Sequence, residues 1–286
     1  MESVDGKVAV ITGAASGMGR AFAQRFGEAG AIIVAVDVEE PALAAATKEM
    51  RASGITCSGH VVDVSSKDEM EAFAAVVFAQ HDNVHLLFNN AGVGGGGRIL
   101  DLIAEDWEWV LGVNLFGVAH GLRLFLPNMV EHGDAHIINT ASVAGHTSFP
   151  GLGPYNASKH AVVTISETLF AELAEDAPGV GVSVLCPGLV NTKILESDRN
   201  RPETLSAPGV ADEATEEEEE IRALMRAAFD AAKDPAEVAE LVYDAVINRQ
   251  FYIFTDQDYD AVIAARHTSI ATRTNPGVSS GLIQDE

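Results

Sequence analysis

The stretch KVAVITGAASGMG, residues 7–19, decides the fold of this chain. An apolar run over Lys7–Ile11 predicts a buried strand, and the pattern of Gly17–Gly30 predicts a helix directly after it. The glycines between them let the backbone turn tightly and approach a ligand closely, while the start of the helix offers free N–H donors to a pyrophosphate. The stretch therefore predicts a dinucleotide site, whose loop residues are Gly13, Ser16, Gly17, Met18 and Gly19.

The second predicted strand, Ala31–Asp37, ends on a carboxylate, which is the residue type that such a site requires next. The carboxylate of Asp37 can accept hydrogen bonds from the adenosine ribose hydroxyls, and it would repel a 2′-phosphate. The residues that follow, Val38, Glu39 and Glu40, include no arginine or lysine to hold that phosphate. We therefore expect NAD rather than NADP as the cofactor.

The rest of the chain repeats the alternation of short apolar runs with longer amphipathic stretches. This order predicts a parallel, doubly wound α/β sheet with helices on both faces, and near-continuous Val, Ile and Leu content fits strands buried on both sides. Further strands are expected at Thr56–Asp63, Val84–Asn89, His136–Thr140, Gly181–Cys186 and Phe251–Phe254, and further helices at Glu69–Gln80, Trp107–Val130, Tyr155–Ala174 and Pro235–Asn248.

Composition narrows the class of protein. The chain has 286 residues, 47% of them hydrophobic and 21% charged, and a net charge of -24. Such a negative field makes nucleic acid and anionic membrane surfaces poor partners. No basic leader and no run of about 18 apolar residues are apparent, so we expect a cytoplasmic protein without a membrane span. The two cysteines form no disulfide framework, and the scattered histidines suggest no metal site.

No linker divides the chain, so residues 1–286 are interpreted as one catalytic domain with one insertion. Residues 189–234 lack a strand pattern and surround the acidic run Glu216–Glu220, which we interpret as a solvated helix face. We expect this insertion to form a lid over the substrate site. The tail, residues 272–286, is polar and rich in glycine and proline, which is typical of a poorly ordered terminus.

Tyr155 and Lys159 lie four residues apart and therefore share one face of the predicted helix. A free tyrosine titrates near pKa ~10. A fixed ammonium nearby favours the phenolate and lowers that pKa, which would make Tyr155 a base near neutral pH. Taken alone, the pair is weak evidence, and a half-buried tyrosine with a lysine whose charged end reaches solvent is the simpler interpretation.

Several motifs together resemble the classical short-chain dehydrogenases/reductases over about residues 5 to 255. They are the glycine loop, the sequence NNAG at 89–92, Ser142, and the Tyr155/Lys159 pair, all in the family's order. The resemblance implies a Rossmann-type sheet of seven strands in the order 3-2-1-4-5-6-7. It also assigns residues to the cofactor beyond the glycine loop and Asp37, namely Val38, Asp63, Val64, Asn90, Ala91, Gly92, Tyr155, Lys159, Pro187, Gly188, Val190 and Thr192.

The same resemblance implies four catalytic residues, Asn114, Ser142, Tyr155 and Lys159. Ser142 and Tyr155 would bind the substrate oxygen, and Tyr155 would take the hydroxyl proton as hydride leaves for the nicotinamide. Lys159 would lower the pKa of Tyr155 and hold the nicotinamide ribose, and Asn114 would anchor a water linked to Lys159. The alternatives are an NADPH-dependent 3-oxoacyl reductase and an NAD-binding scaffold without turnover.

The substrate is expected to be a hydrophobic secondary alcohol or its ketone, of an aryl, terpenoid or steroid-like type. The predicted pocket comprises Ser142, Val143, Phe149, Tyr155 and Leu189, and the insertion adds Ile194, Leu195, Leu205, Leu224, Met225 and Phe229. These lid side chains could equally serve to hold the lid down. The glycines at 94–97 would either make room for substrate or form a flexible loop. The family resemblance also implies a homodimer or homotetramer, formed through the two long helices.

Overall fold

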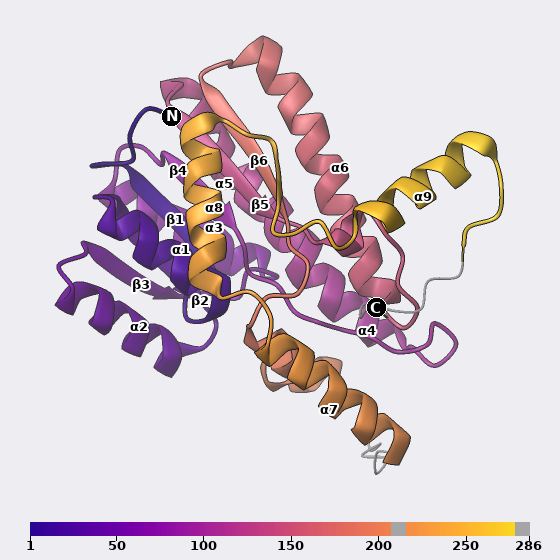
Figure 1. Cartoon of the computed structure of the whole chain (residues 1–286). Helices are drawn as coiled ribbons and strands as arrows, with labels where there is room; N and C mark the ends of the chain where they lie inside the picture. Colours follow the sequence, from indigo (N-terminus) through magenta and orange to yellow (C-terminus); the bar gives the residue numbers. More distant parts are fainter. Residues whose placement is uncertain (207–215, 278–286) are drawn as a thin grey trace.

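The computed structural model describes residues 1–206 and 216–277, and its seven strands form one parallel sheet in the order β3-β2-β1-β4-β5-β6-β7 (Figure 1). The predicted Rossmann-type fold is therefore confirmed. The strands are β1 (Val8–Thr12), β2 (Ile32–Asp37), β3 (Cys57–Val61), β4 (Leu86–Asn89), β5 (Ala135–Thr140), β6 (Val180–Cys186) and β7 (Tyr252–Phe254). The α-helices are α1 (Gly17–Glu28), α2 (Glu40–Ala52), α3 (Lys67–Gln80), α4 (Ala104–Leu111), α5 (Gly117–His132), α6 (Gly153–Asp176), α7 (Glu216–Asp230), α8 (Pro235–Asn248) and α9 (Asp260–Thr272).

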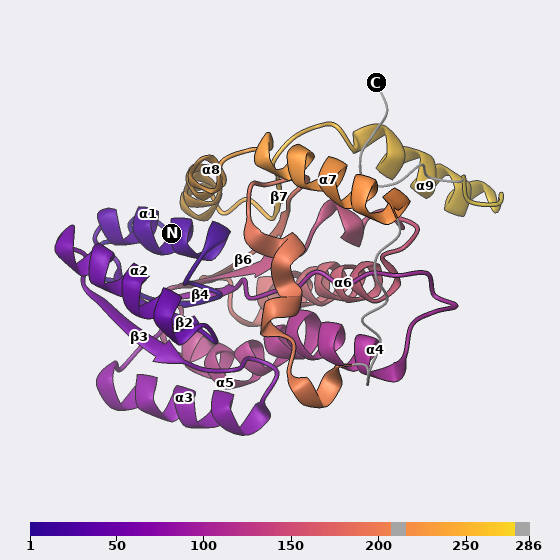
Figure 2. The ribbon, with the colours of Figure 1, turned by 90° about the horizontal axis from the view of Figure 1, so that it is seen from below.

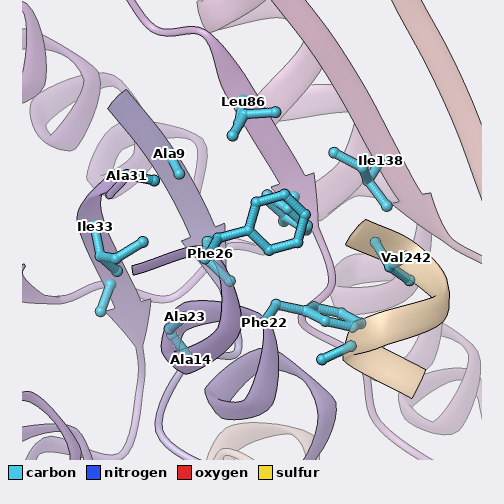
Figure 3. Close-up of a cluster of buried hydrophobic side chains, with 14 of the residues drawn as sticks. Ala9, Ala14, Phe22, Ala23, Phe26, Ala31, Ile33, Leu86, Ile138 and Val242 are labelled. Atoms are coloured by element: carbon cyan, nitrogen blue, oxygen red, sulfur yellow. The ribbon is translucent and has the colours of Figure 1, made fainter. Parts of the chain in front are cut away.

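The helices form two layers, one on each face of the sheet (Figure 2). Helices α1, α2 and α8 cover one face, and α3, α5 and α6 cover the other. On the first face, Phe22 and Phe26 of α1 pack against Phe88 of β4, and Val242 of α8 closes the cluster (Figure 3). Because both faces are covered, every residue of β1 is buried, which explains why its sequence lacks polar alternation.

The predicted helix Trp107–Val130 is longer than expected and is interrupted. It consists of α4, one π-helical turn called η1 (Gly112–Phe116), and α5. The turn contains Asn114, and π-helical turns occur frequently at functional sites. Helices α2 and α9 were not among the predicted ranges. The buried residues of α2 do follow helical spacing, at Leu43, Ala46, Thr47 and Met50, whereas none of the residues of α9 is buried.

The combined helix Ala104–His132 is the one described helix that is long and apolar enough to cross a membrane, by length and composition alone. In this fold it packs against the sheet and α3, and 39% of its most apolar window is buried. The core helix of a soluble protein meets the same criterion. Its apolar character therefore has an explanation within the fold.

The structure describes only part of the insertion and of the tail, so it bears on only part of the predictions for them. Residues 189–206 contain two short 3-10 turns, η3 (Lys193–Asn200) and η4 (Glu203–Leu205), and α7 begins at Glu216. The side chains of residues 216–219 in the acidic run lie outside the described part, as do residues 278–286 of the tail. Glu220, at the end of that run, is exposed.

Candidate active site

One cavity of about 1000 Å³ lies where the strands β1, β2, β4, β5 and β6 end. Ligands of open α/β sheets bind at the carboxyl ends of the strands. The loops after these strands supply most of the wall, and the segment around η3 and η4 supplies the rest. The cavity touches every residue predicted to bind the dinucleotide, although contact with the cavity does not by itself assign their roles.

The glycine loop after β1 is shaped by two positive φ angles and two close approaches. Gly13 and Gly17 have φ angles of +68° and +51°, a region that favours glycine. A Cβ atom on Gly19 would lie 2.0 Å from the carbonyl oxygen of Gly13, and one on Gly13 would lie 2.9 Å from the Cα atom of Ala91. Side chains at 13 and 19 would therefore displace the loop, and their absence leaves a cradle at the start of α1 that fits a pyrophosphate.

Thr12, at the end of β1, fixes the next loop against the first, and the sequence analysis did not single it out. Its hydroxyl donates to the carbonyl oxygen of Phe88 at 3.1 Å and accepts the N–H groups of Asn90 and Ala91 at 2.9 and 3.0 Å. The side-chain amide of Asn90 also donates to the Thr12 carbonyl at 3.0 Å. Asn90 and Ala91 are therefore held beside the cradle by the strand that precedes the glycines.

Asp37 is oriented by the backbone of the same cradle. Its carboxylate accepts the N–H of Ala15 at 2.9 Å and the N–H of Glu39 at 3.0 Å. Burial raises the pKa of Asp37, and these backbone hydrogen bonds partly oppose that rise. A half-buried carboxylate with two fixed donors suits recognition of ribose hydroxyls.

The adenine-side prediction also falls on the cavity wall. Asp63 accepts hydrogen bonds from the backbone and hydroxyl of Ser65 at 2.9 and 2.7 Å, and Val64 lines the cavity beside it. At the opposite end of the cofactor region, Thr192 packs against the glycine loop, because a Cβ on Gly17 would lie 3.1 Å from its methyl group. Pro187, Gly188 and Val190 lead from β6 to this contact.

Ser142, Tyr155 and Lys159 meet between β5 and α6 on the wall of this cavity. Ser142 follows β5 and is buried, and its hydroxyl accepts the N–H of Ala144 at 3.1 Å. Tyr155 is half-buried near the start of α6, and Lys159 lies one turn further along the helix. The helical spacing predicted for the pair is therefore present, and it brings Lys159 Nζ to 5.5 Å from the centre of the Tyr155 ring.

The predicted lowering of the Tyr155 pKa is wrong for the protein without cofactor. Burial raises the pKa of Tyr155, and a hydrogen bond with Ser142 only partly offsets that rise. Burial also lowers the pKa of Lys159 to about 8. The ammonium is directed at the carbonyl oxygen of Thr140, at 3.0 Å, rather than at the phenol.

Asn114 lies behind this group and is not in contact with the cavity. Its amide oxygen accepts the N–H of Val93 at 2.8 Å, and its amide nitrogen donates to the Val93 carbonyl at 3.0 Å and to the Ser158 hydroxyl at 3.2 Å. Ser158 in turn donates to the Tyr155 carbonyl at 2.7 Å. Asn114 thus links the π-helical turn, the loop after β4 and the first turn of α6.

Three residues of the predicted substrate pocket do not line the cavity. Val143 and Phe149 do not line the cavity, because they are buried in a separate cluster with Tyr259. Leu224 of the insertion also lies away from it and is 62% exposed. The described residues at the substrate end include Leu189 and the predicted lid residues Ile194, Leu195, Leu205, Met225 and Phe229, together with Leu102, Trp107 and Trp109, which the sequence analysis did not identify.

The glycines at 94–97 are explained by close packing. A Cβ on Gly95 would lie 2.4 Å from Val110, and one on Gly96 would lie 2.6 Å from the carbonyl oxygen of Gly151. The loop after β4 therefore threads between α4 and the segment before α6. The sequence left two roles open for these glycines, a flexible loop or added room for substrate. Close packing explains the glycines without either role.

Comparisons with known proteins agree with this geometry. Residues 7–203 match the sequence profile of the short chain dehydrogenase family. A crystal structure of a short-chain dehydrogenase/reductase from Burkholderia phymatum in complex with NAD is 44% identical and covers 98% of this chain and 99% of its own, with a TM-score of 0.92.

Curated relatives carry different substrate names. C alpha-dehydrogenase of Sphingobium is 35% identical over 261 residues, covering 88% of this chain and 81% of that protein, and a putative ketoacyl reductase of Streptomyces coelicolor is 36% identical over 244 residues, covering 85% and 90%. The probable oxidoreductase EphD of Mycobacterium tuberculosis is 42% identical over 186 residues. That match covers 65% of this chain, but the chain spans only 31% of the length of EphD.

Proposed function

Because this chain belongs to the short-chain dehydrogenase family and is therefore an oxidoreductase, we propose that it transfers hydride between a hydrophobic secondary alcohol and NAD, giving the ketone. The observation that carries the proposal is the meeting of Ser142, Tyr155 and Lys159 on the wall of a cavity that also contains the glycine cradle. A proton-transfer group and a dinucleotide cradle on one cavity are what a hydride transfer between carbon atoms requires.

The residues divide the chemistry between them. When bound, NAD supplies the carbon that accepts hydride, and its cationic ring also favours the phenolate of Tyr155. Ser142 and Tyr155 bind the oxygen of the alcohol, and the Tyr155 phenolate takes the hydroxyl proton. In the reverse reaction the Tyr155 phenol gives that proton back to the ketone oxygen.

Lys159 and Asn114 position this pair. A side chain at Gly92 would lie 3.6 Å from Lys159 Nζ and 3.4 Å from the amide oxygen of Asn114, so the bare backbone there keeps the space beside both groups open. Lys159, which lines the cavity, would hold the nicotinamide ribose. Asn114 holds the first turn of α6 through Ser158 and so fixes the direction of Tyr155.

The choice of NAD over NADP is supported by Asp37. The carboxylate is fixed by two backbone donors and faces the cavity, where it would bind ribose hydroxyls and repel a 2′-phosphate. The relative crystallised with NAD agrees with this preference. The scaffold alternative is disfavoured, since a protein that only senses NAD has no need of Ser142 and Tyr155.

The substrate class is inferred from the wall beyond Tyr155. Leu102, Leu189, Leu205, Trp109 and Phe229 make it predominantly apolar, which favours a hydrophobic alcohol over a sugar. An aryl secondary alcohol is therefore the first compound to try.

A second candidate is reduction of a 3-oxoacyl group, which the ketoacyl reductase relative favours. One experiment separates the two. The purified protein is mixed with NAD and a panel of aryl, terpenoid, steroid and sugar alcohols, and in parallel with NADPH and a 3-oxoacyl thioester, while reduced nicotinamide is followed by absorbance. We expect NADH formation with an apolar alcohol; preference for a polyol or for the thioester with NADPH would overturn the proposal.

We also propose that the protein works as a homodimer or homotetramer through its long helices. Phe116 of η1 and Phe170 of α6 are 53% and 47% exposed, and large apolar side chains of this kind are typical of interfaces. Light scattering after size-exclusion chromatography measures the mass directly. A monomer at micromolar concentration would contradict this part of the proposal.

A further inference from the structure

An ion pair joins the lid segment to the end of β2. Nε and Nη2 of Arg199 donate to the Oε1 atom of Glu39 at 3.1 and 2.6 Å, and the side-chain amide of Asn200 donates to the same oxygen at 2.9 Å. The two partners are 160 residues apart in the sequence. The hydrogen bond from Arg199 holds the pKa of Glu39 below its usual value, so the carboxylate is ionised at neutral pH.

This ion pair adjoins the carboxylate that would bind the adenosine ribose. The N–H of Glu39 donates to Asp37, and Asp37, Glu39, Arg199 and Asn200 all line the same cavity. A guanidinium is thus present near the ribose end of the site, although the residues next to Asp37 in the sequence provide no cation. An arginine in this neighbourhood is the group that accommodates the 2′-phosphate of NADP.

The donors of this guanidinium are almost fully occupied. Besides the two hydrogen bonds to Glu39, Nη1 of Arg199 donates to the carbonyl oxygens of Lys193 and Glu196 at 3.1 and 2.8 Å. A guanidinium has about five N–H donors, so four of the five are engaged. The charge of Arg199 is therefore neutralised by Glu39, and four of its N–H groups already donate to oxygens of the protein.

We propose that Glu39 determines cofactor specificity by neutralising Arg199, so that NADP is rejected twice, once by Asp37 and once by the occupied guanidinium. This inference rests on the proposed NAD-dependent function and assigns its selectivity to a contact between the lid and β2. Three other cations among the described residues line the cavity, and none duplicates Arg199. Lys159 lies beside the Tyr155 ring. Arg201 pairs with Asp106 of α4 at 2.8 Å, and Lys67 lies 3.6 Å from Glu71 of α3.

Glu39→Gln tests the proposal, since it removes the charge and keeps the size and the acceptor oxygen that holds the lid. Glu40→Gln is the matched control, because the same charge is removed from the next residue, which is exposed and does not line the cavity. Dissociation constants of NADH and NADPH are measured by nicotinamide fluorescence on the purified full chain, after thermal unfolding shows that each variant is folded. Glu39→Ala repeats the test if the glutamine variant does not fold.

We expect Glu39→Gln to strengthen NADPH binding by roughly tenfold with little change for NADH, because a guanidinium whose charge is no longer neutralised makes a charge-assisted hydrogen bond to a phosphate. Glu40→Gln should leave both constants within about twofold of the wild type, the change expected of an exposed charge. Arg199→Met should remove the gain when combined with Glu39→Gln. By itself it should leave the ratio of NADPH to NADH affinity unchanged.

Three outcomes overturn the inference, and each identifies a different fault. If the gain persists in the double variant, Glu39 acts by its own repulsion and not through Arg199. If Glu39→Gln weakens both cofactors equally, the ion pair only fastens the lid. If the wild-type protein binds neither NADH nor NADPH, the proposed function itself fails, and this inference fails with it.

Discussion

The Nζ atom of Lys159 donates a hydrogen bond to the carbonyl oxygen of Thr140 at 3.0 Å, while the side chain is almost fully buried. This contact joins α6 to the end of β5. It leaves the ammonium 5.5 Å from the centre of the Tyr155 ring, close enough to act on the phenol but aimed elsewhere. Lys159 is thus fixed beside Tyr155, but burying its charge lowers the free energy of unfolding, and that loss can be measured.

Replacing Lys159 by methionine should stabilise the protein at neutral pH while removing activity. Burial lowers the pKa of Lys159 from 10.5 to about 8, and a shift of that size corresponds to roughly 3 kcal/mol of unfavourable burial. Some of this is offset by the hydrogen bond to Thr140, so we expect a net gain near 2 kcal/mol in the free energy of unfolding. Chemical denaturation of wild type and Lys159→Met at pH 7 measures it.

The pH dependence of that difference follows from the sign of the shift. Below pH 8 the folded wild type carries a buried charge and bears the full penalty. Between about pH 8 and 10.5 the folded state loses the proton before the unfolded state does, so the penalty disappears as pH rises. The advantage of Lys159→Met should therefore shrink over this range; an advantage that grows with pH would contradict the assignment.

Tyr155 should ionise at a lower pH when NAD is bound. Without cofactor, burial raises the pKa of its phenol above the usual value of 10.0, whereas a cationic ring nearby favours the phenolate. The chain has 4 tyrosines, so the phenolate absorbance of wild type minus Tyr155→Phe isolates one group. The difference curve should move to lower pH on adding NAD and should stay in place with NADH.

Gly19→Ala should weaken NADH binding strongly, because its Cβ would collide with the Gly13 carbonyl at 2.0 Å and distort the cradle. Gly27→Ala in the same helix is the control. Its Cβ would meet Ile55 at 2.4 Å on the other side of α1, away from the cavity. Both variants should lose stability, but only Gly19→Ala should raise the dissociation constant of NADH when measured on folded protein.

Leu189→Ala and Phe149→Leu distinguish a residue that lines the cavity from one that is buried in the core behind it. Leu189 lines the cavity, so its truncation should raise KM for an apolar alcohol by roughly 5- to 150-fold, which corresponds to about 1–3 kcal/mol of lost contact. Phe149 is 2% exposed and does not reach the cavity, so Phe149→Leu should cost about 1 kcal/mol of stability and leave KM unchanged. A change of KM in Phe149→Leu would contradict this placement and would indicate that Phe149 contacts the substrate.

The positions of the strands and of the cofactor loops could be predicted because their signals are local. The residues that mark the cofactor site lie at or just after the strands that position them. Gly13 follows β1, and Asp37 ends β2. The order of the strands came from the family resemblance. Periodicity alone does not contain that order.

Contacts between distant segments could not be predicted in this way. Nothing in the sequence near Glu39 indicates that Arg199 will pair with it, and nothing near Val143 shows that Tyr259 will bury it. The direction of the Tyr155 pKa was wrong for the same reason. Helical spacing identifies a neighbouring charge, but the loss of hydration depends on everything packed around the ring.

The proton transfer assigned to Tyr155 is the centre of the account, and one comparison tests it most directly. Turnover of an apolar alcohol with NAD is measured for wild type and Tyr155→Phe, and the NADH dissociation constant is measured on the same preparations. The account predicts that turnover falls by at least about 10³-fold, because the general base is removed, while NADH binding changes by less than about threefold. Substantial residual turnover in a folded Tyr155→Phe protein that still binds NADH would contradict it.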